Sequence, residues 1–187
     1  MRRTFLSTSC NRIFRGLLAA GAVAVLSGCL GPFPAQPVTL EGAELRPEVF
    51  FAGRTQGVGT LTRLFGRRET LRVEGRGSAG ADGVFRLHQV VTSADGRVEE
   101  RTWHLRRSGR GAYAASLSDA AGPVSVEVTG NRAEIRYLLR QPAVRVRQSL
   151  YMRPDGRSVL NQTTITVLGI PWARLSEEIT RLDPGAD

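Results

Sequence analysis

Apolar and polar residues alternate at every second position from Gly57 onward, and turn-forming residues interrupt this alternation at short intervals. In the segment 124–129, valine occupies every second position between polar residues. A period of two is the geometry of a β-strand with one buried face. The segment 153–157 combines Pro, Asp and Gly, which are typical of a tight turn. Short connections allow only antiparallel neighbours, so the chain is predicted to form an all-β antiparallel meander of roughly eight to ten strands.

A long meander leaves an exposed strand edge at each end, and closure into a barrel removes both edges. We therefore expect a β-barrel domain over residues 46–183, followed by a short tail, 184–187. The segment 169–183 allows two structures. Its apolar residues have a helical spacing after Pro171, which would give a short C-terminal helix. They also alternate as in a strand that could complete the barrel.

Residues 1–28 are typical of a secretory signal peptide. Basic residues near the N-terminus are followed by an uncharged, mainly apolar run, 16–28, that ends in small residues. This run is shorter than the roughly 20 residues that a membrane-spanning helix needs. We expect an N-terminal signal helix that is removed on export.

The sequence Leu26-Ser27-Gly28-Cys29 resembles the lipobox of bacterial lipoproteins. The resemblance implies that the Cys29 thiol carries the lipid and becomes the first residue of the mature chain. Residues 29–45 would then be the lipidated cysteine and a proline-rich tether. Two or three acyl chains hold a protein stably on a membrane. Leu30, in place of the aspartate that retains lipoproteins in the inner membrane, indicates the periplasmic face of the outer membrane.

The basic residues of the chain are all arginine, and the formal net charge is +9. A strongly basic domain often binds nucleic acid. Here an exported chain and arginines that alternate with Glu, Thr and Ser along the strands argue against that partner. The densest group comprises Arg63, Arg67, Arg68 and Arg72. We interpret it as a solvated turn with its flanking strands, and the alternative is contact with anionic lipid head groups.

The two histidines, His88 and His104, are predicted on the face opposite the apolar one, where they could be cross-strand neighbours. A zinc site needs three or four ligands, so no metal is expected. Ser118 and Asp119 could join a histidine in a catalytic triad, but no nucleophile elbow surrounds Ser118. Asp119 is better interpreted as a turn residue that bonds its own backbone. No catalytic residue and no cofactor are predicted, so the chain is not expected to be an enzyme.

Two further features concern the barrel itself. Gly57 and Gly59 precede no helix, so they do not form a phosphate loop; they are predicted to mark a bend where the first strand enters the barrel. Several polar or aromatic residues read as inward-facing, and they could contact a ligand or simply complete the core. These candidates are Gln89, Trp103, Tyr113, Gln148, Asn161 and Thr163.

The chain also carries short motifs over roughly residues 48–182. They are Gly53-x-x-x-Gly57-x-Gly59, Arg101-x-Trp103, Tyr113 followed by Asp119 and Gly122, the Gly130-Asn131 turn, and Leu150-x-Met152 with Leu160-x-x-Thr163. In these motifs the chain resembles the DUF3833 family of bacterial envelope proteins, which have a lipocalin-like (calycin) character. The resemblance implies that the last segment is a strand closing the barrel, and it brings no known activity.

Together these features predict a lipid-anchored envelope barrel that binds a small apolar or amphipathic, lipid-like molecule. The alternative is a non-catalytic structural or interaction lipoprotein that serves envelope maintenance.

Overall fold

The computed structural model describes residues 30–39, 44–139 and 143–183. The predicted signal peptide with its lipobox, Cys29 and the tail 184–187 lie outside these residues. In the described residues, no helix has both the length and the apolar character needed to span a membrane.

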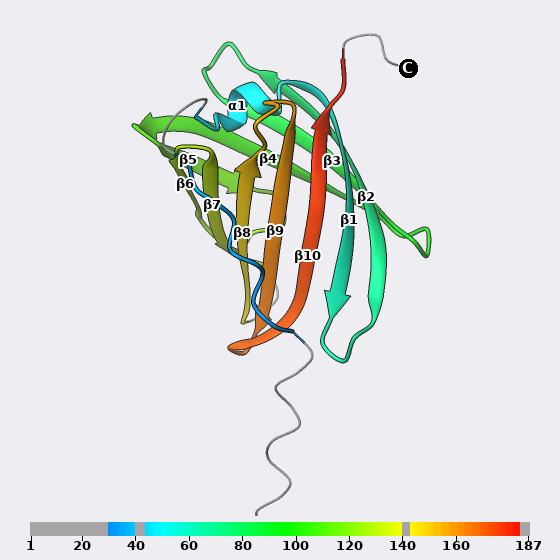
Figure 1. Ribbon diagram of the computed structural model, residues 1–187. Coiled ribbons are helices and arrows are strands. Elements are labelled where there is room, and N and C mark those ends of the chain that lie inside the picture. Colours follow the sequence, from blue (N-terminus) through cyan, green and yellow to red (C-terminus); the bar gives the residue numbers. More distant parts are fainter. Residues whose placement is uncertain (1–29, 40–43, 140–142, 184–187) are drawn as a thin grey trace, which may run out of the picture.

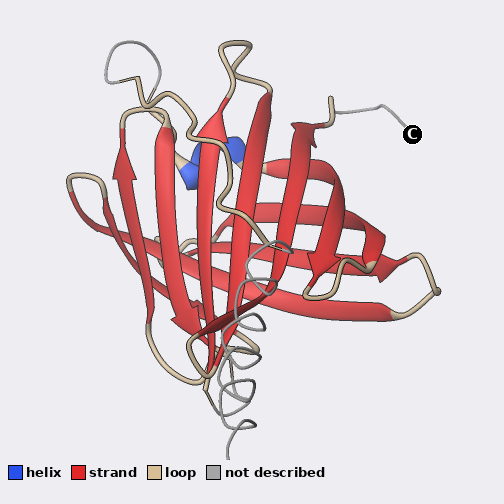
Figure 2. Ribbon diagram, turned by 60° about the horizontal axis from the view of Figure 1, so that its bottom comes forward, coloured by secondary structure: helices blue, strands red, loops and turns tan. Residues whose placement is uncertain are grey.

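Ten antiparallel strands, each paired with its neighbours in the chain, form one closed barrel (Figure 1). The all-β barrel prediction is confirmed. The strands are β1 (Gly53–Arg63), β2 (Arg68–Ala79), β3 (Phe85–Ser93), β4 (Val98–Gly109), β5 (Ala112–Leu117), β6 (Val124–Thr129), β7 (Arg132–Leu138), β8 (Val144–Met152), β9 (Ser158–Val167) and β10 (Ile170–Arg181). Figure 2 shows the strands curving around a common interior.

The segment that allowed either a helix or a strand is strand β10, so the alternative of a short C-terminal helix is wrong. β10 pairs with β1 from Thr55↔Arg181 to Arg63↔Ala173, and with β9 on its other side. Its buried residues alternate with exposed ones along the strand. A helix here would leave the edges of β1 and β9 unpaired, whereas the strand satisfies the backbone groups of both.

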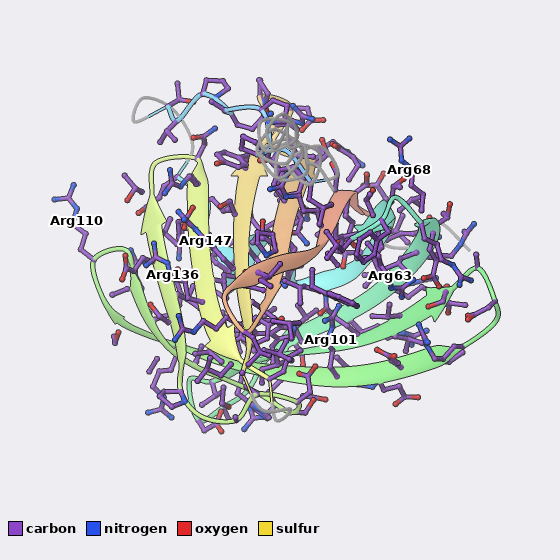
Figure 3. The ribbon with its side chains drawn as sticks, turned by 90° about the horizontal axis from the view of Figure 1, so that it is seen from below. Arg63, Arg68, Arg101, Arg110, Arg136 and Arg147 are labelled. Atoms are coloured by element: carbon purple, nitrogen blue, oxygen red, sulfur yellow. The ribbon has the colours of Figure 1, made fainter. Side chains whose placement is uncertain are left out.

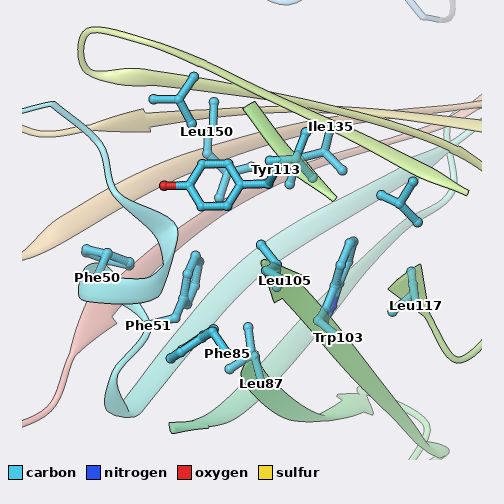
Figure 4. Close-up of a cluster of buried hydrophobic side chains, with 14 of the residues drawn as sticks. Phe50, Phe51, Phe85, Leu87, Trp103, Leu105, Tyr113, Leu117, Ile135 and Leu150 are labelled. Atoms are coloured by element: carbon cyan, nitrogen blue, oxygen red, sulfur yellow. The ribbon is translucent and has the colours of Figure 1, made fainter. Parts of the chain in front are cut away.

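A single helical turn, α1 (Pro47–Phe50), closes one end of the barrel. The alternating pattern of the sequence did not predict this helix. Phe50 is 1% exposed and packs edge-on against Phe51 at 4.9 Å between ring centroids (Figure 4). Leu45 is fully buried, and its backbone N–H donates to the Gly130 carbonyl at 2.8 Å. We call this the plugged end and the opposite end, where β1 finishes and β2 begins, the mouth.

Two apolar clusters fill the barrel. The larger lies at the plugged end and includes Phe50 of α1 with the flanking residues Leu45 and Phe51 (Figure 4). The smaller lies toward the mouth and comprises Leu61, Leu71, Val73, Val91, Ala173 and Leu175. The side chain of Ile165 packs against both clusters. The inward-facing polar residues lie where these two clusters meet.

The described part of the predicted tether, residues 30–39, lies against the outside of the barrel (Figure 1). At the plugged end, the Thr39 N–H donates to Asn131 Oδ1 at 2.9 Å, and the Asn131 N–H donates to the Thr39 carbonyl at 3.0 Å. Toward the mouth, the Phe33 ring covers the guanidinium of Arg174 at 5.4 Å. The segment therefore runs along the barrel wall, from the mouth end at Phe33 to the plugged end at Thr39.

Candidate functional site in the barrel interior

A layer of polar side chains crosses the barrel between its two apolar clusters. We call it the polar layer; it comprises Gln89, Arg101, Gln148, Asn161, Thr163 and Glu177. These residues come from β3, β4, β8, β9 and β10. Side chains alternate between the two faces of a strand, and these residues occupy inward-facing positions. Arg101 is thus two residues from buried Trp103, and Glu177 lies between buried Leu175 and Ile179.

Three members of the polar layer form a chain of hydrogen bonds. Thr163 Oγ1 donates to Asn161 Oδ1 at 3.0 Å, and Asn161 Nδ2 donates to Glu177 Oε2 at 2.9 Å. All three side chains are buried. Burial raises the pKa of Glu177, and this effect exceeds the lowering by the Asn161 hydrogen bond and by the positive charge of Arg101. The layer therefore favours a neutral carboxylic acid at its centre.

Gly57 and Gly59 make room for this carboxyl group, a role that the predicted bend did not include. Both lie inside β1, whose register with β2 and β10 is unbroken there. A Cβ atom at Gly57 would lie 2.0 Å from Glu177 Oε1, and one at Gly59 would lie 2.8 Å from the Glu177 Cβ. A side chain at either position would occupy the space of Glu177. The glycines thus serve packing between neighbouring strands.

Two further hydrogen bonds tie the polar layer to buried aromatic residues. Trp103 Nε1 donates to Gln89 Oε1 at 2.8 Å, and Gln148 Nε2 donates to the Tyr137 hydroxyl at 3.3 Å. The Trp103 and Tyr137 rings meet edge to face at 5.8 Å. Burial raises the pKa of Tyr137 to about 12, so its hydroxyl stays protonated. These contacts hold both glutamines in place.

Three buried polar atoms inside the barrel have no hydrogen-bond partner among the described residues: Arg101 Nε, Asp119 Oδ1 and Glu177 Oε1. Asp119 was interpreted as a turn residue bonded to its own backbone, and the structure contradicts this. The turn is closed by the backbone alone, from the Ala120 N–H to the Leu117 carbonyl at 3.0 Å, while the Asp119 side chain lines the interior. Buried polar atoms of this kind require a partner, which water or a ligand can supply.

The polar layer separates two cavities. The inner cavity, beneath α1, has a volume of about 50 Å³ and is lined mainly by apolar residues of the plugged end. The mouth cavity has a volume of about 230 Å³, and Arg101, Gln148 and Asn161 line both. Arg97 and Glu99, whose side chains are 52% and 69% exposed, line the mouth cavity, so it reaches the surface. Figure 3 looks at this end and shows Arg101 near the middle of the view.

The structure brings most of the predicted ligand-facing residues together. Gln89 and Trp103 line the inner cavity, Thr163 lines the mouth cavity, and Gln148 and Asn161 line both. Tyr113 lines neither. It is buried in the plugged-end cluster (Figure 4). Its hydroxyl donates to Glu48 Oε2 of α1 at 2.7 Å.

Sequence reasoning did not single out Arg101 and Glu177 as site residues. The signal was present in the alternation, because a charged residue in register with buried apolar neighbours must face inward.

The residues considered for a catalytic triad do not lie together. His88 and His104 are exposed on the outer face; His88 lies opposite Thr102 and His104 opposite Arg86, so the histidines are offset and not directly paired. Ser118 Oγ accepts a hydrogen bond from the Thr102 N–H at 3.1 Å. Asp119 faces the interior, so the three residue types do not converge. Within the described residues, no three His, Cys, Asp or Glu side chains lie close enough together to hold a metal ion.

Replacing Glu177 with glutamine tests the state of the buried carboxyl group. Between the ordinary pKa of 4.5 and the raised pKa, the folded chain holds a proton that the unfolded chain has lost. The stability of the native chain therefore falls as the pH rises through this window, whereas Glu177→Gln has no such loss. We expect Glu177→Gln to gain stability relative to the native chain as the pH rises above the ordinary pKa of 4.5, measured by urea unfolding. Glu178→Gln, on the exposed face of the same strand, should show no such trend. If the difference in unfolding free energy between Glu177→Gln and the native chain were the same at all pH values, the raised pKa of Glu177 would be contradicted.

The fold and interior define the class of protein: a ten-stranded, calycin-like antiparallel barrel with an internal cavity open at one end. The model of the family described as "Protein of unknown function (DUF3833)" matches residues 23–181, and the chain belongs to this family. No curated protein matches the chain.

Several solved structures share the fold. The S-type phycobiliprotein lyase CPES from Guillardia theta is 8% identical, with a TM-score of 0.56 over 75% of this chain and 93% of that chain. Rv2717c from M. tuberculosis is 18% identical, with a TM-score of 0.54 over 74% and 99%. A protein of the DUF3598 family from Nostoc punctiforme is 13% identical, with a TM-score of 0.57 over 74% of this chain and 51% of that chain. At these identities the likeness concerns the fold alone.

Proposed function

We propose that this protein is a lipid-anchored protein of the bacterial envelope that binds a small amphipathic molecule in the mouth cavity, without catalysing a reaction. Cys29 would carry the anchor, on the periplasmic face of the outer membrane. The observation that carries the binding function is the cavity itself. Its volume of about 230 Å³ is many times the 10–15 Å³ or so that one water molecule needs.

The lining of the mouth cavity sets the chemistry of the ligand. Its walls are mixed. The apolar lining residues include Leu61, Leu71, Val91, Val146, Ile165 and Leu175, and charged side chains such as Arg63, Arg97 and Glu99 lie between them and the surface. Its polar atoms without a partner are of opposite kinds, because Arg101 Nε can only donate a hydrogen bond and Asp119 Oδ1 accepts one when ionised. A ligand with an apolar body and a head group that accepts a hydrogen bond from Arg101, such as a carboxylate, an amide or a hydroxyl, matches this lining.

Native mass spectrometry on residues 30–187, purified gently from the periplasm, tests the proposal. This chain contains every described residue, including the complete barrel and its plug. We expect an additional mass that is released on unfolding. Calorimetric titration with dodecanoate then serves as a defined probe. Arg101→Met should weaken dodecanoate binding by about tenfold or more, because a hydrogen bond to a charged group is lost.

Arg72→Met is the matched control, since Arg72 lies on the exposed face of β2 and outside both cavities. It should bind dodecanoate as the native chain does. A bare mass together with no dodecanoate binding would contradict the ligand-binding function. That result would favour the alternative, a non-catalytic interaction protein of the envelope.

A further inference from the structure

Large apolar side chains gather at the tips of two neighbouring hairpins at the mouth. Phe65, in the β1–β2 turn, is 73% exposed, and Leu168, in the β9–β10 turn, is 79% exposed. Ile170 and Trp172, at the start of β10, are 57% and 46% exposed. The Leu64 N–H donates to the Trp172 carbonyl at 2.7 Å, which joins the two hairpins. We call these four side chains the apolar tips; such a grouping on a surface marks an interaction site.

The backbone at the apolar tips is strained. Phe65 and Leu168 have φ angles of 68° and 50°, and each precedes a glycine that also has positive φ. Asn, Asp and Gly suit such turn positions, whereas bulky residues are disfavoured there. At the Asp-Gly pairs 82–83, 95–96 and 155–156, only the glycine has positive φ. The two mouth turns thus hold apolar residues where turn geometry alone favours Asn, which indicates a function for the side chains.

Positive charge accompanies the apolar tips. Arg67, in the same turn as Phe65, and Arg68, the first residue of β2, are exposed and form no ion pair within the described residues. Figure 3 shows Arg68 pointing away from the barrel. The acidic residue next to Arg68 in the sequence, Glu69, is paired with Arg63. The acidic residues Asp95 and Glu99 belong to the β3–β4 hairpin, which diverges from the apolar tips in Figure 1.

The path of the chain points to the same end. Residues 30–39, blue in Figure 1, run along the barrel wall, and this segment begins at the end of the barrel where the β9–β10 turn lies. The contact between Phe33 and Arg174 holds this segment against β10 close to Trp172. The first described residues of the chain therefore lie at the same end of the barrel as the apolar tips.

We propose that the apolar tips and the adjacent Arg67 and Arg68 form a docking surface for an anionic lipid membrane, with the mouth facing the bilayer. The apolar side chains enter the interface between head groups and acyl chains, Trp172 lies at head-group level, and the guanidinium groups contact lipid phosphates. A ligand could then pass between the membrane and the mouth cavity without crossing water. The docking surface consists only of residues on the outside of the barrel. Membrane binding through it requires neither a ligand in the cavity nor lipid at Cys29.

Vesicle flotation with residues 30–187, which lack the anchor, tests this surface. The chain has two tryptophans, of which Trp103 is 5% exposed and Trp172 is 46% exposed, so Trp172 reports on the membrane. Phosphatidylcholine vesicles with about one third phosphatidylglycerol should float the protein and shift its tryptophan emission to the blue. Pure phosphatidylcholine vesicles, or added salt, should weaken binding because the charge attraction is lost or screened.

The decisive variant carries Phe65→Asn and Leu168→Asn together. Asn accepts positive φ, so this change relieves backbone strain while it removes the apolar contact. We expect the partition coefficient to fall by about tenfold or more. The control pair, Val58→Thr and Val98→Thr, changes valines that are 49% and 56% exposed but lie away from the tips, and should bind as the native chain does. Arg67→Gln with Arg68→Gln should weaken binding to anionic vesicles by about thirtyfold.

Three results would overturn the docking surface. The native chain could stay unbound to anionic vesicles at low salt. The Phe65→Asn, Leu168→Asn chain could bind as well as the native chain. The valine control could lose as much affinity as the tip variant. Each of these leaves the mouth cavity untested, because dodecanoate binding is measured without vesicles.

Discussion

Phe50→Ala is expected to lower the free energy of unfolding by about 3–5 kcal/mol, the range found when a fully buried phenylalanine is truncated. Phe50 is 1% exposed, in the single helical turn that closes the barrel. Its ring packs against Phe51 and belongs to the plugged-end cluster. A helix of four residues has little stability of its own, so its place depends on this burial. Chemical denaturation of residues 30–187 would measure the loss.

Val49 provides a control within the same turn. It is 44% exposed, so Val49→Ala should change the stability by no more than about 0.5 kcal/mol. A loss below about 1 kcal/mol for Phe50→Ala would show that α1 rests on the barrel without contributing to its core.

Gly77→Ala is expected to destabilise the protein by about 3 kcal/mol, because there is no room for a methyl group beneath α1. A Cβ atom at Gly77 would lie 2.1 Å from the Phe51 carbonyl oxygen and 2.5 Å from Phe85 Cζ. The first of these is a backbone atom, which cannot move unless the plug shifts off the barrel. The loss would be measured by the same denaturation experiment.

Gly109→Ala is the matched control for Gly77→Ala, because Gly109 also lies in a strand. Its added Cβ would meet only the Ala112 Cβ, at 4.0 Å, which is an ordinary contact. We expect a change of no more than about 0.5 kcal/mol there. Equal losses at the two positions would mean that the cost comes from replacing glycine in general, and would argue against the close approach of α1 to β2.

The alternation of residues predicted much of the interior as well as the fold. Gln148, Asn161 and Thr163 face inward as expected, because the side-chain period of a strand is independent of its partners. The same rule, applied to charged residues, would have placed Arg101 and Glu177 inside. Charged residues are seldom buried, and that expectation outweighed the register.

The roles of some residues could not be predicted from the alternation of residues along a strand. Gly57 and Gly59 suggested a bend, but their role depends on Glu177, which is far away in the chain and is brought next to them by the closure of β10 on β1. Asp119 suggested a local turn, but its side chain faces the mouth cavity. In both cases the role of the residue depends on neighbours that are far away in the sequence and are brought close by strand pairing.

The chain's local pattern was enough to establish an antiparallel barrel, its turns and the inward face of most strands, because alternation and turn chemistry act between residues adjacent in the sequence. The choice of strand for residues 170–181, the plug formed by α1, the division of the interior by the polar layer and the meeting of the apolar tips came from the folded chain. These features arise between segments far apart in the sequence, where closing the last edge and filling the barrel outweigh local preference.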